Sequence, residues 1–266
     1  ILILMLIITS IISCKDDNVV ENLEQQNLQS SSDYLLIEKT LIDIQRIVEH
    51  SLISNGITKN CITYIVKNND PLNTDTLITD FGEVNCLHLG QLNRGKIITI
   101  YSDYIHDSSA IINNTFDNFY LNNNLIQGNI ILENLGPNIN QDYIYNLDIN
   151  NISVTTHNGI INLNANYKKT LIDGKSTKYQ YLDDVYLIAG SAEGNSVNNN
   201  NFNMQITDSL TINNICFESS KCVITRGKST ISTDIYEDRE LDYGSNLCDC
   251  KVNVEINNEP YLIVID

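Results

Sequence analysis

The feature that most constrains the fold is the alternation of strands and turns from Cys61 to the end of the chain. Short runs rich in β-branched residues are separated there by Asn, Gly and Asp, which favour turns. No segment after residue 54 shows a helical period of useful length. The pattern predicts a mainly β protein built as an antiparallel sandwich or barrel. The predicted strands include 61–66, 96–101, 129–133, 152–156, 185–188, 251–256 and 261–265, with a tight turn at Asn257-Asn258.

One amphipathic helix is predicted before the strands, over residues 34–54. Its apolar residues recur at spacings of three and four, which places them on one face. Ser32 or Asp33 is expected to cap its first turn. We expect the apolar face to pack on the β body. The residues that form this face are Ile37, Leu41, Ile44, Val48 and Leu52.

The β region contains a short internal sequence repeat, which we call the echo and which is a sign of repeated structure. An Asp-aromatic-Gly triplet precedes a cysteine at the same spacing in two places, and another cysteine lies 25 or 26 positions upstream of that cysteine. The echo predicts two related β units, at 56–160 and 161–266. The residues that match are 80–82 with Cys86 and Cys61, and 242–244 with Cys248 and Cys222.

The first residues predict export from the cytoplasm. Residues 1–13 are uncharged and almost wholly apolar. They are too short to span a bilayer, which takes about 20 residues, but they fit the apolar part of a signal peptide whose basic start is missing. The run ends in Ile11-Ile12-Ser13-Cys14, which resembles a bacterial lipobox, so a diacylglycerol is expected on Cys14. The alternative is a secreted protein with a chance cysteine at this position.

The residues after Cys14 predict export to the cell surface and a tether between the membrane and the β body. Lys15-Asp16-Asp17 resembles the acidic export signal that follows the lipid cysteine in surface lipoproteins of the Bacteroidetes. Residues 14–33 are polar and rich in Gln, Asn and Ser, and they are predicted to form a flexible tether. The lipid on Cys14 is then the expected membrane anchor.

Once Cys14 is set aside, an even set of cysteines is left for disulfides, which form outside the reducing cytoplasm. The echo favours the pairs Cys61–Cys86 and Cys222–Cys248, and Cys216–Cys250 follows by elimination. Zinc binding is the competing interpretation of these cysteines. It is not favoured, because Cys248 and Cys250 lack the usual ligand spacing and have no histidine nearby.

Charge and motifs exclude several classes of function. The net charge of −17 and the pI of about 4.4 disfavour nucleic acid as a partner. No polybasic run could hold the chain on anionic lipid. The Gly-Lys-Ser-Thr segments at 174–177 and 227–230 lack the first glycine of a phosphate-binding loop. Asp183 and Asp184 would face opposite ways on a strand. No cofactor, metal site or catalytic residue is predicted.

An ordered set of segments resembles uncharacterised surface lipoproteins of the Bacteroidetes, in which similar segments follow a short helix. The resemblance covers roughly residues 35–265. That family implies no established activity, so no catalytic residue carries over. The segments that carry the resemblance are 94–100, 115–120 leading to Gly128, 183–190, and 241–244 leading to Cys248-Asp249.

These features together predict a lipid-anchored protein of the bacterial outer membrane, exposed at the cell surface. The leading hypothesis is a non-enzymatic module for binding, adhesion or envelope structure, with a glycan or protein ligand held by surface residues. One alternative is an extracellular glycan or peptide hydrolase whose carboxylates meet only in the fold. Another is a subunit of an outer-membrane assembly. The sequence leaves the oligomeric state open.

Overall fold

A computed structural model describes residues 17–54, 61–70, 74–219 and 222–265 of the chain. It contains one long α-helix, fourteen strands and two short 3₁₀ helices. The bounds are α1 Asp17–Ile53, β1 Thr63–Asp70, β2 Thr74–Asp80, β3 Cys86–His88, β4 Gln91–Tyr101, β5 Ile111–Leu121, β6 Asn124–Pro137, β7 Tyr143–Thr155, β8 Ile160–Asp173, η1 Tyr181–Asp183, β9 Val185–Asn195, β10 Asn201–Asn213, η2 Asn214–Glu218, β11 Ile224–Thr233, β12 Arg239–Ser245, β13 Lys251–Ile256 and β14 Glu259–Val264.

The strands form one antiparallel sheet in which nearly every strand pairs with the next one along the chain. The exception is β3, which lies beside β4 and outside the main order. The mainly β fold predicted from the sequence is therefore confirmed. The tight turn is confirmed as well, because Asn257 and Asn258 both have positive φ and join the paired strands β13 and β14.

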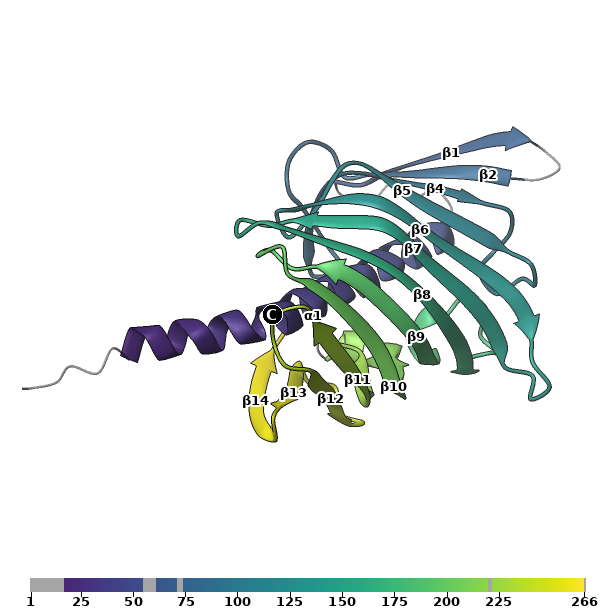
Figure 1. The fold of residues 1–266 in the computed structure, drawn as a ribbon. Coiled ribbons are helices and arrows are strands. Elements are labelled where there is room, and N and C mark those ends of the chain that lie inside the picture. The colour runs from purple at the N-terminus through teal and green to yellow at the C-terminus, as the bar shows by residue number, and fades with distance from the viewer. Residues whose placement is uncertain (1–16, 55–60, 71–73, 220–221, 266) are drawn as a thin grey trace, which may run out of the picture.

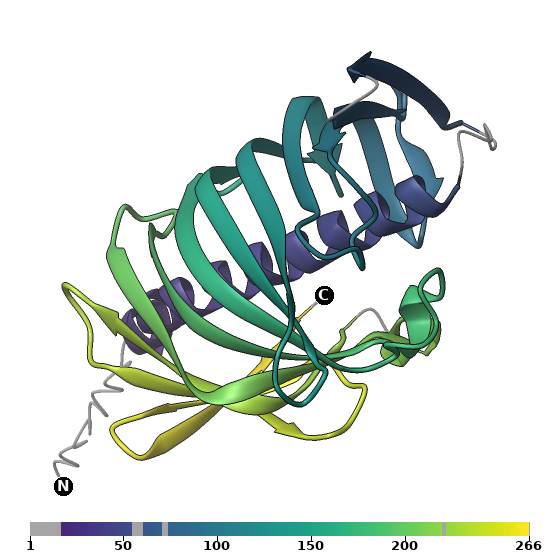
Figure 2. The ribbon, with the colours of Figure 1, turned by 90° about the vertical axis from the view of Figure 1, so that its right-hand side faces the viewer.

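The sheet curls around α1, which lies along its concave inner face (Figure 1, Figure 2). The sandwich or barrel expected from the strand pattern is not what forms, because the strands run in one open order from β1 to β14. The physical reason is the helix. It covers the apolar inner face, so the described strands need neither a second sheet nor closure to bury that face.

The inner and outer faces follow from the two-residue period of a strand. In β13, Val252, Val254 and Ile256 are buried, whereas the residues between them are exposed. The same alternation runs through the longer strands, and it gives one continuous core between the sheet and α1. The outer face is correspondingly polar over much of its area.

The helix begins at Asp17, well before the predicted start. The flexible tether expected over 14–33 is therefore wrong for residues 17–33, and so is a cap at Ser32 or Asp33. The sheet holds part of this segment, because the Asp33 carboxylate accepts the Val197 amide at 2.9 Å. The buried Arg239 also donates to the Asn27 carbonyl at 2.8 Å. Such contacts hold a polar sequence in a helix that its own composition would not stabilise.

The internal echo corresponds to a shared local structure. In 80–82 and in 242–244 the aspartate accepts the glycine amide, at 2.9 and 2.8 Å, and the glycine has φ of +76° and +89°. The neighbouring strand presents Arg-Gly-Lys in both places, at 94–96 and 226–228, with the lysine 3.6 Å from the aspartate. The Asp strand comes first in one place and second in the other. The match is thus a local cross-strand arrangement, present near both ends of the sheet and not repeated in strand order.

The described residues contain three disulfides. Cys61–Cys86 forms as predicted. The other two expected pairs are wrong, because the structure joins Cys216 to Cys248 and Cys222 to Cys250.

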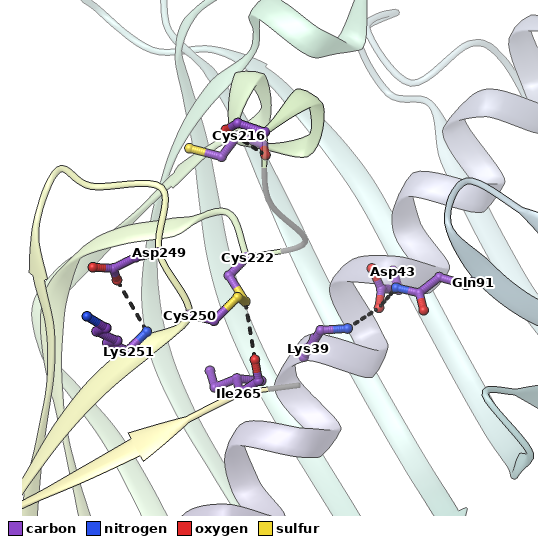
Figure 3. Close-up of a disulfide and its surroundings, with 10 residues drawn as sticks. Lys39, Asp43, Gln91, Cys216, Cys222, Asp249, Cys250, Lys251 and Ile265 are labelled. Atoms are coloured by element: carbon purple, nitrogen blue, oxygen red, sulfur yellow. Dashed lines mark hydrogen bonds and ion pairs between the residues drawn. A yellow bond between two sulfur atoms is a disulfide. The ribbon is translucent and has the colours of Figure 1, made fainter.

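Local packing explains the exchange of partners. The amide of Ile265, at the end of β14, donates to the Cys250 carbonyl at 2.8 Å. The Cys222 sulfur lies 3.9 Å from the Ile265 carbonyl oxygen (Figure 3). Cys222 and Cys250 therefore meet at the end of β14, beside α1, and Cys248 is left to reach Cys216 in η2.

Candidate functional site

The outer face of the sheet carries a shallow polar groove of about 460 Å³ across β7 to β11. Its side chains come from alternate positions of five neighbouring strands, on the face opposite α1. Those side chains belong to Asp148, Asn150, Asn164, Asn166, Ser191, Glu193, Asn203, Gln205, Thr230 and Ser232.

Strand register places most of these residues in two parallel rows that run across the strands. Neighbouring strands are about 4.8 Å apart, so a row over five strands spans about 19 Å. The first row is Asp148, Asn166, Ser191, Gln205 and Thr230. The second row is Asn164, Glu193, Asn203 and Ser232.

The groove offers hydrogen bonds and little positive charge. Asn166 donates to the Asp148 carboxylate, which orders one end of the first row. At the centre Ser191, Glu193 and Asn203 are exposed. The described residues that line the groove include no lysine, arginine or aromatic side chain. The surface is therefore suited to a polar, uncharged ligand with many hydroxyl groups.

A second group of polar residues is buried between α1 and the inner face of the sheet. The Lys169 ammonium lies 3.9 Å from a Glu49 carboxylate oxygen and 3.7 Å from the centre of the Tyr186 ring. The Tyr186 hydroxyl donates to Asp184 Oδ2 at 2.7 Å, and His106 Nε2 lies 3.8 Å from the same oxygen. We call Glu49, His106, Lys169, Asp184 and Tyr186 the internal cluster.

Burial shifts the pKa values of the internal cluster. It raises the pKa of Asp184 to about 7, against the lowering effect of the hydrogen bond from Tyr186. Burial, followed by the charge of Lys169, lowers the pKa of His106 to about 4. His106 is therefore neutral at physiological pH, and its contact with Asp184 is not an ion pair. Burial also lowers the pKa of Lys169 and raises that of Glu49.

Two loops cover the internal cluster. Lys178 Nζ binds both carboxylate oxygens of Asp107, at 2.7 and 2.9 Å. Beside this pair the rings of Tyr104 and Tyr179 lie 5.0 Å apart. Asp184 is only 1% exposed, and its Oδ1 has no hydrogen-bond partner in the structure. The cluster has the perturbed acids typical of an active site, but both of its carboxylates, Asp184 and Glu49, are buried.

A third polar contact lies near the middle of α1. The two oxygens of the Glu38 carboxylate accept the hydroxyl groups of Tyr34 and Tyr243, at 2.8 and 2.9 Å. Desolvation outweighs both bonds and raises the pKa of Glu38 to about 7. Tyr243 belongs to the second copy of the echo, so this copy supports the helix directly.

The predicted anchor lies mostly outside the described residues. Cys14, Lys15 and Asp16 are not among them, and Asp17 is the first residue of α1. Asp183 and Asp184 do not lie on a strand as expected, since Asp183 ends η1 and Asp184 precedes β9. Their carboxylates are nevertheless separated, because Asp183 is exposed and Asp184 is buried.

Sequence reasoning missed both the groove and the internal cluster. A signal for the cluster was present in β8, where Lys169 occupies an inward position between Tyr167 and Leu171. An ionisable group at such a position needs a partner inside the protein. The groove had a weaker signal, because its Asn and Ser residues also fit ordinary solvent-facing positions of a sheet.

The described residues contain no group of three or more His, Cys, Asp or Glu side chains placed to hold a metal ion. In that part of the chain, no helix combines the length and apolarity that a bilayer span requires. No protein-family model, no curated protein and no solved structure matches the chain.

Proposed function

We propose that this chain is a lipid-anchored binding protein of the bacterial cell surface, and that its ligand lies in the outer groove. The observation that carries the proposal is the pair of polar rows across β7 to β11. They form a continuous polar surface on the outer face of the sheet, opposite the hydrophobic core. The inner face, in contrast, is filled by α1 and its contacts.

The proposed anchor is the thiol of Cys14, followed by the export signal Lys15-Asp16-Asp17. Cys14 lies three positions before the first residue of α1. Ten helical residues then precede Asn27, whose carbonyl oxygen accepts a hydrogen bond from Arg239 on β12. At 1.5 Å per residue, this part of α1 is a spacer of about 15 Å. It projects beyond the sheet in Figure 1. A helical spacer would hold the β body away from a membrane, as a flexible tether would.

The alternative of a hydrolase would place its acid and base in the internal cluster. Asp184 has the raised pKa that suits a general acid, and Glu49 is a second carboxylate nearby. Both are at least nine-tenths buried beneath the loops that carry Asp107 and Lys178. We therefore favour binding over hydrolysis, and we assign the internal cluster to holding α1 in the sheet.

The test is a binding screen of the full chain in mild detergent, on arrays of glycans and of cell-envelope and host proteins. We expect the wild-type chain to bind, and the triple variant Asn164→Ala, Glu193→Ala, Asn203→Ala to lose most of that binding. On expressing cells, palmitate should label the wild-type chain and not the Cys14→Ser variant. The same screen with Gln127→Ala is a control, because Gln127 is exposed on β6 and does not line the groove. Silence of the wild-type chain on both arrays would contradict the proposal.

A further inference from the structure

We infer that the ligand of the outer groove is an uncharged, extended polysaccharide that lies across the strands. This inference rests on the proposed function and names the chemical class of its ligand. It follows from the charge of the groove, the direction of its rows and the lack of an apolar pocket.

The charge of the groove selects against anionic ligands. Its titratable side chains are the carboxylates of Asp148 and Glu193, and its described lining has no cation to balance them. The whole chain has a net charge of −17, so its long-range electrostatic field also repels anions. Uronic-acid chains, sulfated glycans and phosphate groups would be repelled. Amides, hydroxyls and carboxylates are, in contrast, a good match for sugar hydroxyl groups, which both donate and accept hydrogen bonds.

The geometry of the rows favours a chain over a single sugar. The two rows run side by side, and each strand from β8 to β11 adds a polar side chain to both rows, about every 4.8 Å. A pyranose ring has about this length, so successive sugars of an extended chain would meet equivalent donors and acceptors. The first row, which spans about 19 Å, matches about four sugars. An open groove without an end wall also leaves room for the chain to continue.

A peptide ligand fits the groove less well. Peptides add to a free strand edge or insert side chains into apolar pockets. The groove lies over the middle of the sheet, where β7 to β11 are each paired on both sides. The apolar neighbours of its lining residues, such as Ile149 and Met204, are buried on the opposite face. The surface therefore provides neither of the two usual means of peptide recognition.

The lack of aromatic rings predicts weak binding by each protein. Sugar-binding sites gain much of their affinity from stacking, and the described lining has no ring to stack on. Many anchored copies on one cell would offset this weakness, because a polysaccharide chain meets several grooves at once. The inferred ligand therefore also gives the lipid anchor a role in binding strength.

The test is affinity electrophoresis of the full chain in gels that contain a neutral polysaccharide, such as dextran, mannan or β-glucan, or an acidic one, such as alginate or hyaluronan. We expect retardation by at least one neutral polymer and by neither acidic polymer. Raising the salt to about 0.5 M should leave it unchanged, because no ion pair contributes. Asn203→Ala should weaken retardation about fivefold, the effect of one lost hydrogen bond. Gln127→Ala should have no effect.

Soluble fragments give a second readout. Oligosaccharides of about four sugars should compete much better than single sugars, since only the longer ones fill a row. Retardation by acidic polymers alone, or neutral binding that ignores Asn203→Ala, would overturn the inference. If the groove variants instead lose binding to a protein or an acidic glycan, the groove remains the binding site and only the inferred ligand class fails. If they change no binding at all, the proposed function fails as well.

Discussion

Single positions in this sheet are constrained by how closely two strand backbones approach. Gly95 has φ of +81°, and a Cβ there would lie 1.9 Å from the Asn118 carbonyl oxygen. Gly82 has a similar φ of +76°, yet a Cβ there would meet nothing within 4 Å. The two glycines belong to the same copy of the echo. They therefore separate the cost of the backbone conformation from the cost of a clash.

We expect Gly82→Ala to destabilise the protein by about 1 kcal/mol, because an L-residue is strained at positive φ. Gly95→Ala should cost about 3 kcal/mol, since the strands must also move apart. Free energies of unfolding from urea titrations of both variants would measure the difference. Equal losses would show that β4 and β5 adjust to the methyl group without strain.

Residue patterns alone located the core better than the polar sites. The apolar residues of α1, such as Ile37 and Ile44, are fully buried as their spacing predicted. Glu38 and Glu49 lie on the same helix, and nothing in its periodicity shows that they find partners on β8 and β12. Such contacts join residues more than a hundred positions apart, so they depend on the curvature of the whole sheet.

At the scale of elements, the strands and their turns were predictable and the closure of the sheet was not. Strand period and turn residues are local properties, and they located β13, β14 and the Asn257-Asn258 turn closely. Whether a sheet closes depends on what covers its inner face. The sequence of α1 showed an apolar stripe but not that the helix lies inside the curl of the sheet. The disulfide pairs of the C-terminal half were missed for a similar reason, because β14 brings Cys250 to Cys222.

The disulfide assignment gives a prediction about these elements. Peptide mapping without reduction should recover Cys216 linked to Cys248 and Cys222 linked to Cys250. The double variant Cys222→Ser, Cys250→Ser should lose about 3.5 kcal/mol of stability, the chain-entropy value for a separation of 28 residues. Removing Cys61–Cys86, with a separation of 25, should cost nearly the same in urea titrations. A peptide that links Cys222 to Cys248 would contradict the structure.

At the scale of the whole molecule, the proton balance of folding links the helix to the sheet. The pKa values of Asp184 and Glu38 are both raised to about 7, so in the folded protein each carboxyl group is protonated below neutral pH. In the unfolded chain the same groups lose their protons above pH ~4. This stabilisation is complete in acid and is lost as pH rises through 7. His106 acts in the opposite direction. Its pKa is lowered to about 4, so it is neutral in the folded protein at pH values where the same side chain is protonated in the unfolded chain. The raised pKa values of Asp33, Asp43 and Glu49 add to the carboxyl side.

Between pH ~5 and 6.5 the carboxyl groups with raised pKa values therefore outnumber His106, and folding takes up a net proton. Stability should fall as pH rises across this window, by on the order of 1 kcal/mol per unit for one proton. Asp184→Asn removes one proton from the balance and should make the slope shallower, and adding Glu38→Gln should make it shallower still, because each variant removes a carboxyl group with a raised pKa. Urea titrations at several pH values would measure all three slopes. A wild-type stability that rises with pH in this window would mean that these carboxyls are ionised in the folded protein, and that α1 is held in the sheet by charge pairs and not by neutral hydrogen bonds.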